Sequence, residues 1–152
     1  MTDEAIQVRP GRAVRVGVVP YEPEAALRIV VLLGLLGVAL VHLLDLSGTI
    51  TSSPVQGTLY LFLIAGCLVT DSLLLHGTSL TRWLMAAILV TATASAYVLT
   101  RTVGLPFDHS DIGNWGDSLG IAALFLEGVV VIAACYGMWL GRTITTFSSS
   151  RA

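Results

Sequence analysis

The sequence is poor in charge and contains no lysine at all. Charged residues make up 12% of the 152 residues, 55% are hydrophobic, and the mean hydropathy is +0.83. This composition excludes an ordinary water-soluble globular domain and predicts a surface that faces lipid. All eight basic residues are arginine, which together with the many alanine, valine and leucine residues favours a high-GC bacterial genome.

Catalytic and redox motifs are also missing from the sequence. The two cysteines, Cys67 and Cys135, show neither a CxxC nor a metal-ligand spacing, so we expect buried apolar side chains rather than a disulfide. The chain has no Gly-x-Ser-x-Gly, P-loop, dinucleotide-binding glycine pattern, HExxH or CxxCH. An enzyme of a familiar kind is therefore unsupported, and so is covalently attached haem. No nucleic-acid partner is expected.

What the chain does contain is four long apolar stretches. Each approaches the length of about 20 residues that crosses about 30 Å of hydrocarbon. They predict an all-α integral membrane protein in which four transmembrane helices form an antiparallel bundle. The predicted parts are an N-terminal tail (1–26), a membrane domain (27–142) with spans at about 27–46, 58–75, 83–100 and 118–140, and a disordered tail (143–152).

The segments between the spans differ in length and composition. Residues 47–57 include Gly48 and Pro54 and predict a loop, and residues 76–81 predict a short turn. The longest connection, residues 101–117, contains Gly104 and Pro106, which would end the helix and turn the chain back over the bundle. We expect this connection to form an ordered loop on the outer side.

The arginines predict the orientation in the membrane. If the N-terminus lies in the cytoplasm, seven of the eight arginines are cytoplasmic and only Arg101 is outside. Both termini are then cytoplasmic, and the location we predict is the bacterial inner membrane. The partners we expect are the lipid bilayer and either another membrane protein or a second copy of the chain.

Three ionisable residues lie at membrane depth and are candidate site residues. Asp71 is in the inner half of the second span, Glu127 is in the outer half of the fourth, and Arg101 ends the third. A charge in hydrocarbon is costly unless it is paired or hydrated. The structural interpretation is an Arg101–Glu127 ion pair, with Asp71 capped by the hydroxyls of its neighbours Thr70 and Ser72 or by an inner-loop group such as Arg82. The functional alternative is a proton or cation site.

A second candidate site lies near the outer surface. His42 and Asp45 are three residues apart and share a helix face, and the loop residues His109 and Asp111 lie at a similar depth. Imidazole and carboxylate ligands would suit zinc, copper or iron. The alternative is a solvated cluster that binds no cofactor.

Three functions remain open from the sequence. The first is a non-catalytic accessory or structural subunit that binds a membrane partner or lipid. The second is an oligomeric ion- or proton-coupled transporter or channel that uses Asp71 or Glu127. The third is a protein that binds a metal or redox cofactor at its outer face.

Overall fold

A computed structural model describes residues 23–106 and 108–149, with side chains described up to Gly141. Within these ranges the chain forms four helices: α1 (Pro23–Ser52), α2 (Pro54–Leu75), α3 (Leu80–Thr102) and α4 (Ser118–Ser149). All four are long and apolar enough to cross a membrane, which confirms the predicted all-helical membrane protein at that level. Residues 1–22, the greater part of the predicted N-terminal tail, lie outside the described residues.

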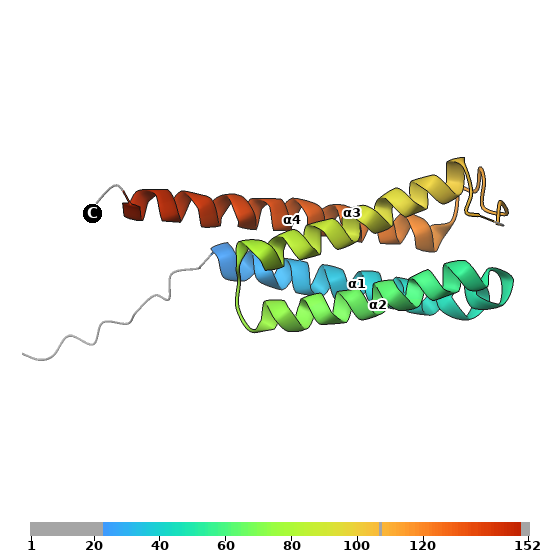
Figure 1. Ribbon diagram of the computed structural model, residues 1–152, viewed down its shortest axis with the longest axis horizontal. Coiled ribbons are helices and arrows are strands. Elements are labelled where there is room, and N and C mark those ends of the chain that lie inside the picture. The colour runs from blue at the N-terminus through green and yellow to red at the C-terminus, as the bar shows by residue number, and fades with distance from the viewer. Residues whose placement is uncertain (1–22, 107, 150–152) are drawn as a thin grey trace, which may run out of the picture.

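The helices lie lengthwise beside one another as two pairs, α1 with α2 and α3 with α4 (Figure 1). The beginning of α1 and the end of α4 are at one end of the molecule, and the α3–α4 loop is at the other. We call this second end the loop end. α1 packs against both α2 and α4, and α3 packs against α4, whereas α2 and α3 pack against each other less than any other two helices that follow one another in the chain.

The surface of α1 shows why this fold suits lipid. Val31, Leu35, Val38 and His42 recur every three or four residues, so they share one helix face and are buried. The opposite face is equally apolar, and Leu33 there is 64% exposed. A helix that is hydrophobic on all sides is typical of a membrane span.

The predicted loop at residues 47–57 is wrong, because α1 runs through Ser52 and only Ser53 separates it from α2. Polar residues in this stretch are accommodated in the helix: the Thr51 hydroxyl donates to the Gly48 carbonyl at 2.8 Å. Pro54 then opens α2, where its missing N–H costs nothing. A Cβ atom at Gly57 would lie 2.6 Å from the Ile50 Cα atom, so only glycine allows this tight corner.

The fourth helix is also longer than the predicted span. It begins at Ser118 as expected but continues to Ser149, into the segment 143–152 for which we expected disorder. No proline follows Gly141 in this segment, so nothing in the sequence forces the helix to stop there.

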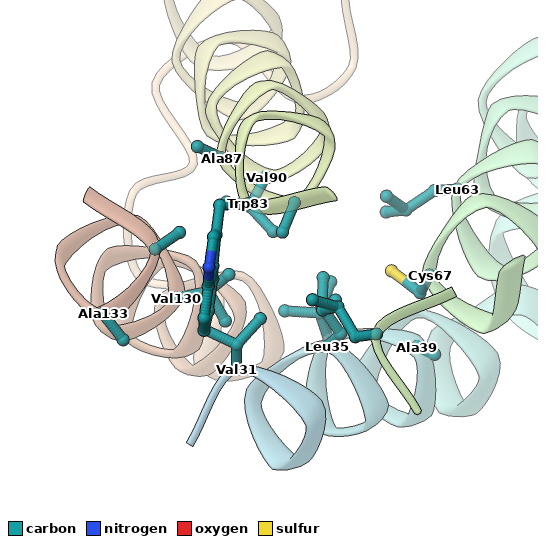
Figure 2. Packing of buried hydrophobic residues seen from close by; sticks show 14 residues of the cluster. Val31, Leu35, Ala39, Leu63, Cys67, Trp83, Ala87, Val90, Val130 and Ala133 are labelled. Carbon is teal, nitrogen blue, oxygen red and sulfur yellow. The ribbon is translucent and has the colours of Figure 1, made fainter. Parts of the chain in front are cut away.

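The core joins all four helices through small and branched side chains (Figure 2). Trp83 of α3 is 3% exposed, and its ring lies against α4, where a Cβ atom added at Gly137 would be 2.8 Å from the ring. A Cβ atom at Gly34 would collide with Val130, so α1 and α4 are in backbone-close contact at this point. From their short connection α2 and α3 diverge toward the loop end (Figure 1), which leaves room for a cavity in that half of the bundle.

Candidate ligand cavity

A cavity of about 310 Å³ lies between the helices in the loop-end half of the bundle, and all four helices contribute to it. Its walls are largely apolar and include Leu59, Leu63, Leu89, Ala123 and Leu124. Ala92 and Ala96 of α3 also line it and are exposed, so the cavity is open rather than sealed. Apolar walls with a few polar groups are typical of a small-molecule site.

Arg101 forms the centre of the polar end of this cavity. Its guanidinium is 2.6 Å from the Asp111 carboxylate and 3.2 Å from the Asp117 carboxylate, although only 5% of its side chain is exposed. It also lies 4.7 Å from the centre of the Tyr97 ring, in cation–π contact. Asp117 additionally accepts from the backbone N–H groups of Leu119 and Gly120 at the start of α4.

A second group of polar side chains comes from α1 and α2. Asp45 accepts hydrogen bonds from the Thr49 hydroxyl at 3.1 Å and the Tyr60 hydroxyl at 3.2 Å. Gln56 donates to the Tyr60 hydroxyl at 3.1 Å and to the Asp111 carboxylate at 3.4 Å. Gln56 therefore connects this group to the Arg101 cluster.

Together these contacts form one continuous chain of side chains at the loop end. We call it the polar network; its members are Asp45, Thr49, Gln56, Tyr60, Arg101, Asp111 and Asp117. It includes residues from every helix or its border, so it closes the loop end of the bundle. The α3–α4 loop is held to the bundle by Asp111 and by a 2.9 Å bond from the Gly113 N–H to the Arg101 carbonyl.

The loop has a further contact to the α1–α2 corner through Asp108. Hydrogen bonds from the Ser53 and Ser110 hydroxyls lower the pKa of the Asp108 carboxyl to about 2. The Ser110 hydroxyl lies 2.7 Å from the carboxylate. Asp108 is thus a charged group near neutral pH, held by the two serines.

Glu127 is placed at the opposite, deeper end of the cavity. Its side chain is 2% exposed, and within the described residues neither carboxyl oxygen has a hydrogen-bond partner. The predicted Arg101–Glu127 ion pair is therefore wrong. Glu127 follows Asp117 by nearly three helical turns, about 15 Å along α4, and the two loop-end carboxylates, Asp111 and Asp117, already occupy Arg101.

Asp71 is buried apart from the cavity, in the other half of α2. It is 9% exposed, and its Oδ1 atom has no partner among the described residues. The predicted cap is absent at Thr70, whose hydroxyl donates instead to the Gly66 carbonyl at 2.8 Å. Cys67, one turn before Asp71, is fully buried and lies within electrostatic reach of both Asp71 and Glu127.

The predicted metal ligands do not gather at one point. His42 lines the cavity with its Nδ1 atom 2.9 Å from the Val38 carbonyl, and its ring meets Tyr60 edge-on. Asp45 and Asp111 belong to the polar network, and His109 is exposed in the loop. In residues 23–106 and 108–149, no three His, Cys, Asp or Glu side chains are grouped so that they could hold a metal ion.

Three residues of the site were not predicted from the sequence: Gln56, Tyr60 and Tyr97. Gln56 falls in the segment that we predicted as a loop, so its place on a helix facing the bundle was not evident. The two tyrosines carry a signal that could have been used, because a hydroxyl near the end of an apolar span tends to find a polar partner. Tyr60 does so with Asp45, whereas the buried Tyr97 hydroxyl has no hydrogen-bond partner in the described part of the chain.

Comparison with known proteins adds no further constraint. No protein-family model matches the chain, and no curated protein and no solved structure shows significant similarity to it. The cavity, the polar network and Glu127 are therefore the features from which a function has to be argued.

Proposed function

We propose that this protein is a small, non-catalytic membrane protein that takes up an amphipathic molecule from the surrounding bilayer into its cavity. The observation that supports this most directly is the cavity itself. It holds about 310 Å³, has apolar walls and is lined by residues of both α2 and α3, which pack only weakly against each other. This volume is at the lower end of the range of small-molecule pockets, about 300–1,000 Å³.

The proposal includes the orientation and the location. With four antiparallel spans both termini lie on the same side of the membrane, and the arginine distribution favours the cytoplasm for the termini and the outside for the loop end. The membrane is then the bacterial inner membrane, and the α3–α4 connection is an ordered outer loop supported by its contacts to Arg101 and Gln56. In the cell the protein would act as an accessory subunit, with the outer loop and the exposed helix faces available to a membrane-protein partner or a second copy.

A pair of variants on α3 tests the binding function. Ala96 lines the cavity and is exposed, so Ala96→Phe should place a ring in the cavity without disturbing the core. Val98 is 46% exposed and does not line the cavity, so Val98→Phe is the matched control. Native mass spectrometry from lipid nanodiscs should show a bound molecule on the natural protein and on Val98→Phe, and loss of it from Ala96→Phe. Equal occupancy of all three proteins would contradict the proposal.

A second candidate function, ion- or proton-coupled transport, is favoured by one observation. Asp71 and Glu127 are both buried, the Asp71 Oδ1 atom and both Glu127 carboxyl oxygens have no hydrogen-bond partner in the described part of the chain, and Cys67 lies within electrostatic reach of each acid. Two buried carboxyl groups, one in each half of the bundle, could pass a proton across the membrane, as paired acids do in proton pumps and transporters. A proteoliposome assay of proton flux should then show a flux that both Asp71→Asn and Glu127→Gln remove, and flux no greater than in protein-free vesicles would exclude this function.

The third hypothesis, a metal at His42, Asp45, His109 and Asp111, has less support from the geometry. Two of the four side chains have other partners, since Asp45 accepts from Tyr60 and Asp111 pairs with Arg101. A metal there would have to displace these contacts. Stoichiometric zinc, copper or iron in the purified protein would nonetheless establish such a site.

A further inference from the structure

The charges around the cavity are unequal in sign. The residues that line it include three acids, Asp45, Asp117 and Glu127, and one arginine, Arg101. Arg101 is already held by Asp111 and Asp117, so its charge is compensated before any ligand arrives. An anionic ligand would therefore find no free cation among the described residues that line the cavity.

Of the acidic residues that line the cavity, Glu127 is the one for which the described residues provide no hydrogen-bond or ion-pair partner. Glu127 is one of the residues that line the cavity, its side chain is 2% exposed, and neither carboxyl oxygen, both closed off from solvent, has a hydrogen-bond partner in the described ranges. Leaving a buried carboxylate unpaired costs several kcal/mol by order of magnitude, and a nearby positive charge would offset that cost. The occupant of the cavity is thus expected to bring the missing positive charge to Glu127.

The depth of Glu127 restricts what that occupant can be. The carboxyl lies about 15 Å along α4 from Asp117, at which the polar network ends. The headgroup of a bilayer lipid stays at the water interface, so a long-chain lipid would place its acyl chain, not its charge, beside Glu127. A compact ligand that carries its charge within an apolar body fits better, because the cavity in which it would lie is lined by apolar side chains, among them Leu59, Leu63, Leu89 and Leu124.

We propose that the cavity binds a compact hydrophobic organic cation, a protonated amine or quaternary ammonium, whose positive charge pairs with the Glu127 carboxylate. This inference rests on the proposed binding function and specifies the ligand class for it. The Tyr60 and Tyr97 rings, which also line the cavity, present further surfaces that attract organic cations.

Three probes of nearly equal shape test the charge preference. Phenyltrimethylammonium is the cation, tert-butylbenzene is its neutral isostere, and benzenesulfonate is an anion of similar size. Their binding to the purified full-length protein in nanodiscs is measured by equilibrium dialysis, with protein-free nanodiscs subtracted. We expect the cation to bind at least about tenfold more tightly than the isostere, equivalent to about 1.4 kcal/mol, and the anion not to bind.

Variants of Glu127 assign the preference to this residue. Glu127→Gln should remove the preference for the cation, whereas Glu127→Asp, which keeps a carboxylate, should retain most of it. Equal binding of cation and isostere, no binding of either, or an unchanged preference in Glu127→Gln would each overturn the inference.

The two proposals fail in different ways. If the natural protein carries a bound molecule that Ala96→Phe loses, but shows no charge preference among the three probes, the cavity binds amphipathic molecules and only the cation assignment is wrong. If no bound molecule is found in any protein and none of the probes binds, both proposals are wrong.

Discussion

Arg101 shows how a single residue changes its meaning between sequence and structure. By position it is the arginine that opposes the orientation of the other seven, which made it a natural partner for a buried acid. In the structure its partners are the carboxylates that the α3–α4 loop brings back over it, Asp111 and Asp117. The preference for these partners follows from depth, since Arg101 and Asp117 are both at the loop end and Glu127 is not.

Replacing Arg101 tests its role in closing the loop end. Arg101→Met should lower the free energy of unfolding by about 2–3 kcal/mol, because two carboxylates lose their partner. The loss is less than for a fully buried pair, since Asp111 and Asp117 remain 28% and 30% exposed. Unfolding in mixed micelles with increasing dodecyl sulfate measures it. Arg28→Met is the control, because Arg28 makes no ion pair with a residue in the described ranges, and equal stability losses in the two variants would argue against the network.

Glycine residues allow neighbouring helices to approach each other closely and so contribute to their packing. α1 approaches α4 closely at Gly34, where a Cβ atom would collide with Val130. On the same helix, Gly48 has open space around its Cα atom, with nothing within 4 Å of an added Cβ atom. Because hydrocarbon surrounds the helices on the outside, close contact of this kind is a main source of association between membrane helices.

These two glycines make a matched test of the α1–α4 contact. Gly34→Ala should destabilise the protein by about 1–3 kcal/mol through overpacking. Gly48→Ala should leave stability unchanged or raise it by up to about 1 kcal/mol, because alanine favours the helix. The same micelle unfolding assay compares them. If Gly34→Ala were as stable as Gly48→Ala, α1 and α4 would not be packed as closely as described.

At the scale of the whole molecule, the polar network and the cavity occupy the same end of the bundle. The network fixes the loop end through contacts from every helix, whereas α2 and α3 are left in little contact below it. The helices are therefore joined by side-chain contacts at the loop end, whereas α2 and α3 pack only weakly against each other along their length. A ligand would then enter between α2 and α3 from the lipid rather than through the network, which is the reason for expecting a membrane-soluble ligand.

The proposed orientation of the molecule is tested by thiol labelling of intact cells. Ser110→Cys lies in the α3–α4 loop and His76→Cys in the α2–α3 turn, and both positions are exposed. A membrane-impermeant maleimide should label Ser110→Cys from outside and should reach His76→Cys only after the cells are permeabilised. The natural protein provides the background, since Cys67 is buried and Cys135, although exposed, lies within the fourth span. The reverse labelling pattern would invert the orientation and place the cavity on the cytoplasmic side.

The sequence alone determined that the chain has four apolar helices and that Asp71, Glu127 and Arg101 lie among them, because hydrophobic length and the position of a charge along a span can be read locally. It also predicted the start of α4 at Ser118. It did not determine the α1–α2 corner, since Pro54 and the serine residues there suit a loop and a helix boundary equally well. Only the tertiary structure decided which carboxylates pair with Arg101, that Gln56 and Tyr60 join them, and that Glu127 lines a cavity with no partner among residues 23–106 and 108–141. Those outcomes depend on which helices are neighbours and at what depth their side chains meet. Neither can be deduced from the pattern of residues within a single helix.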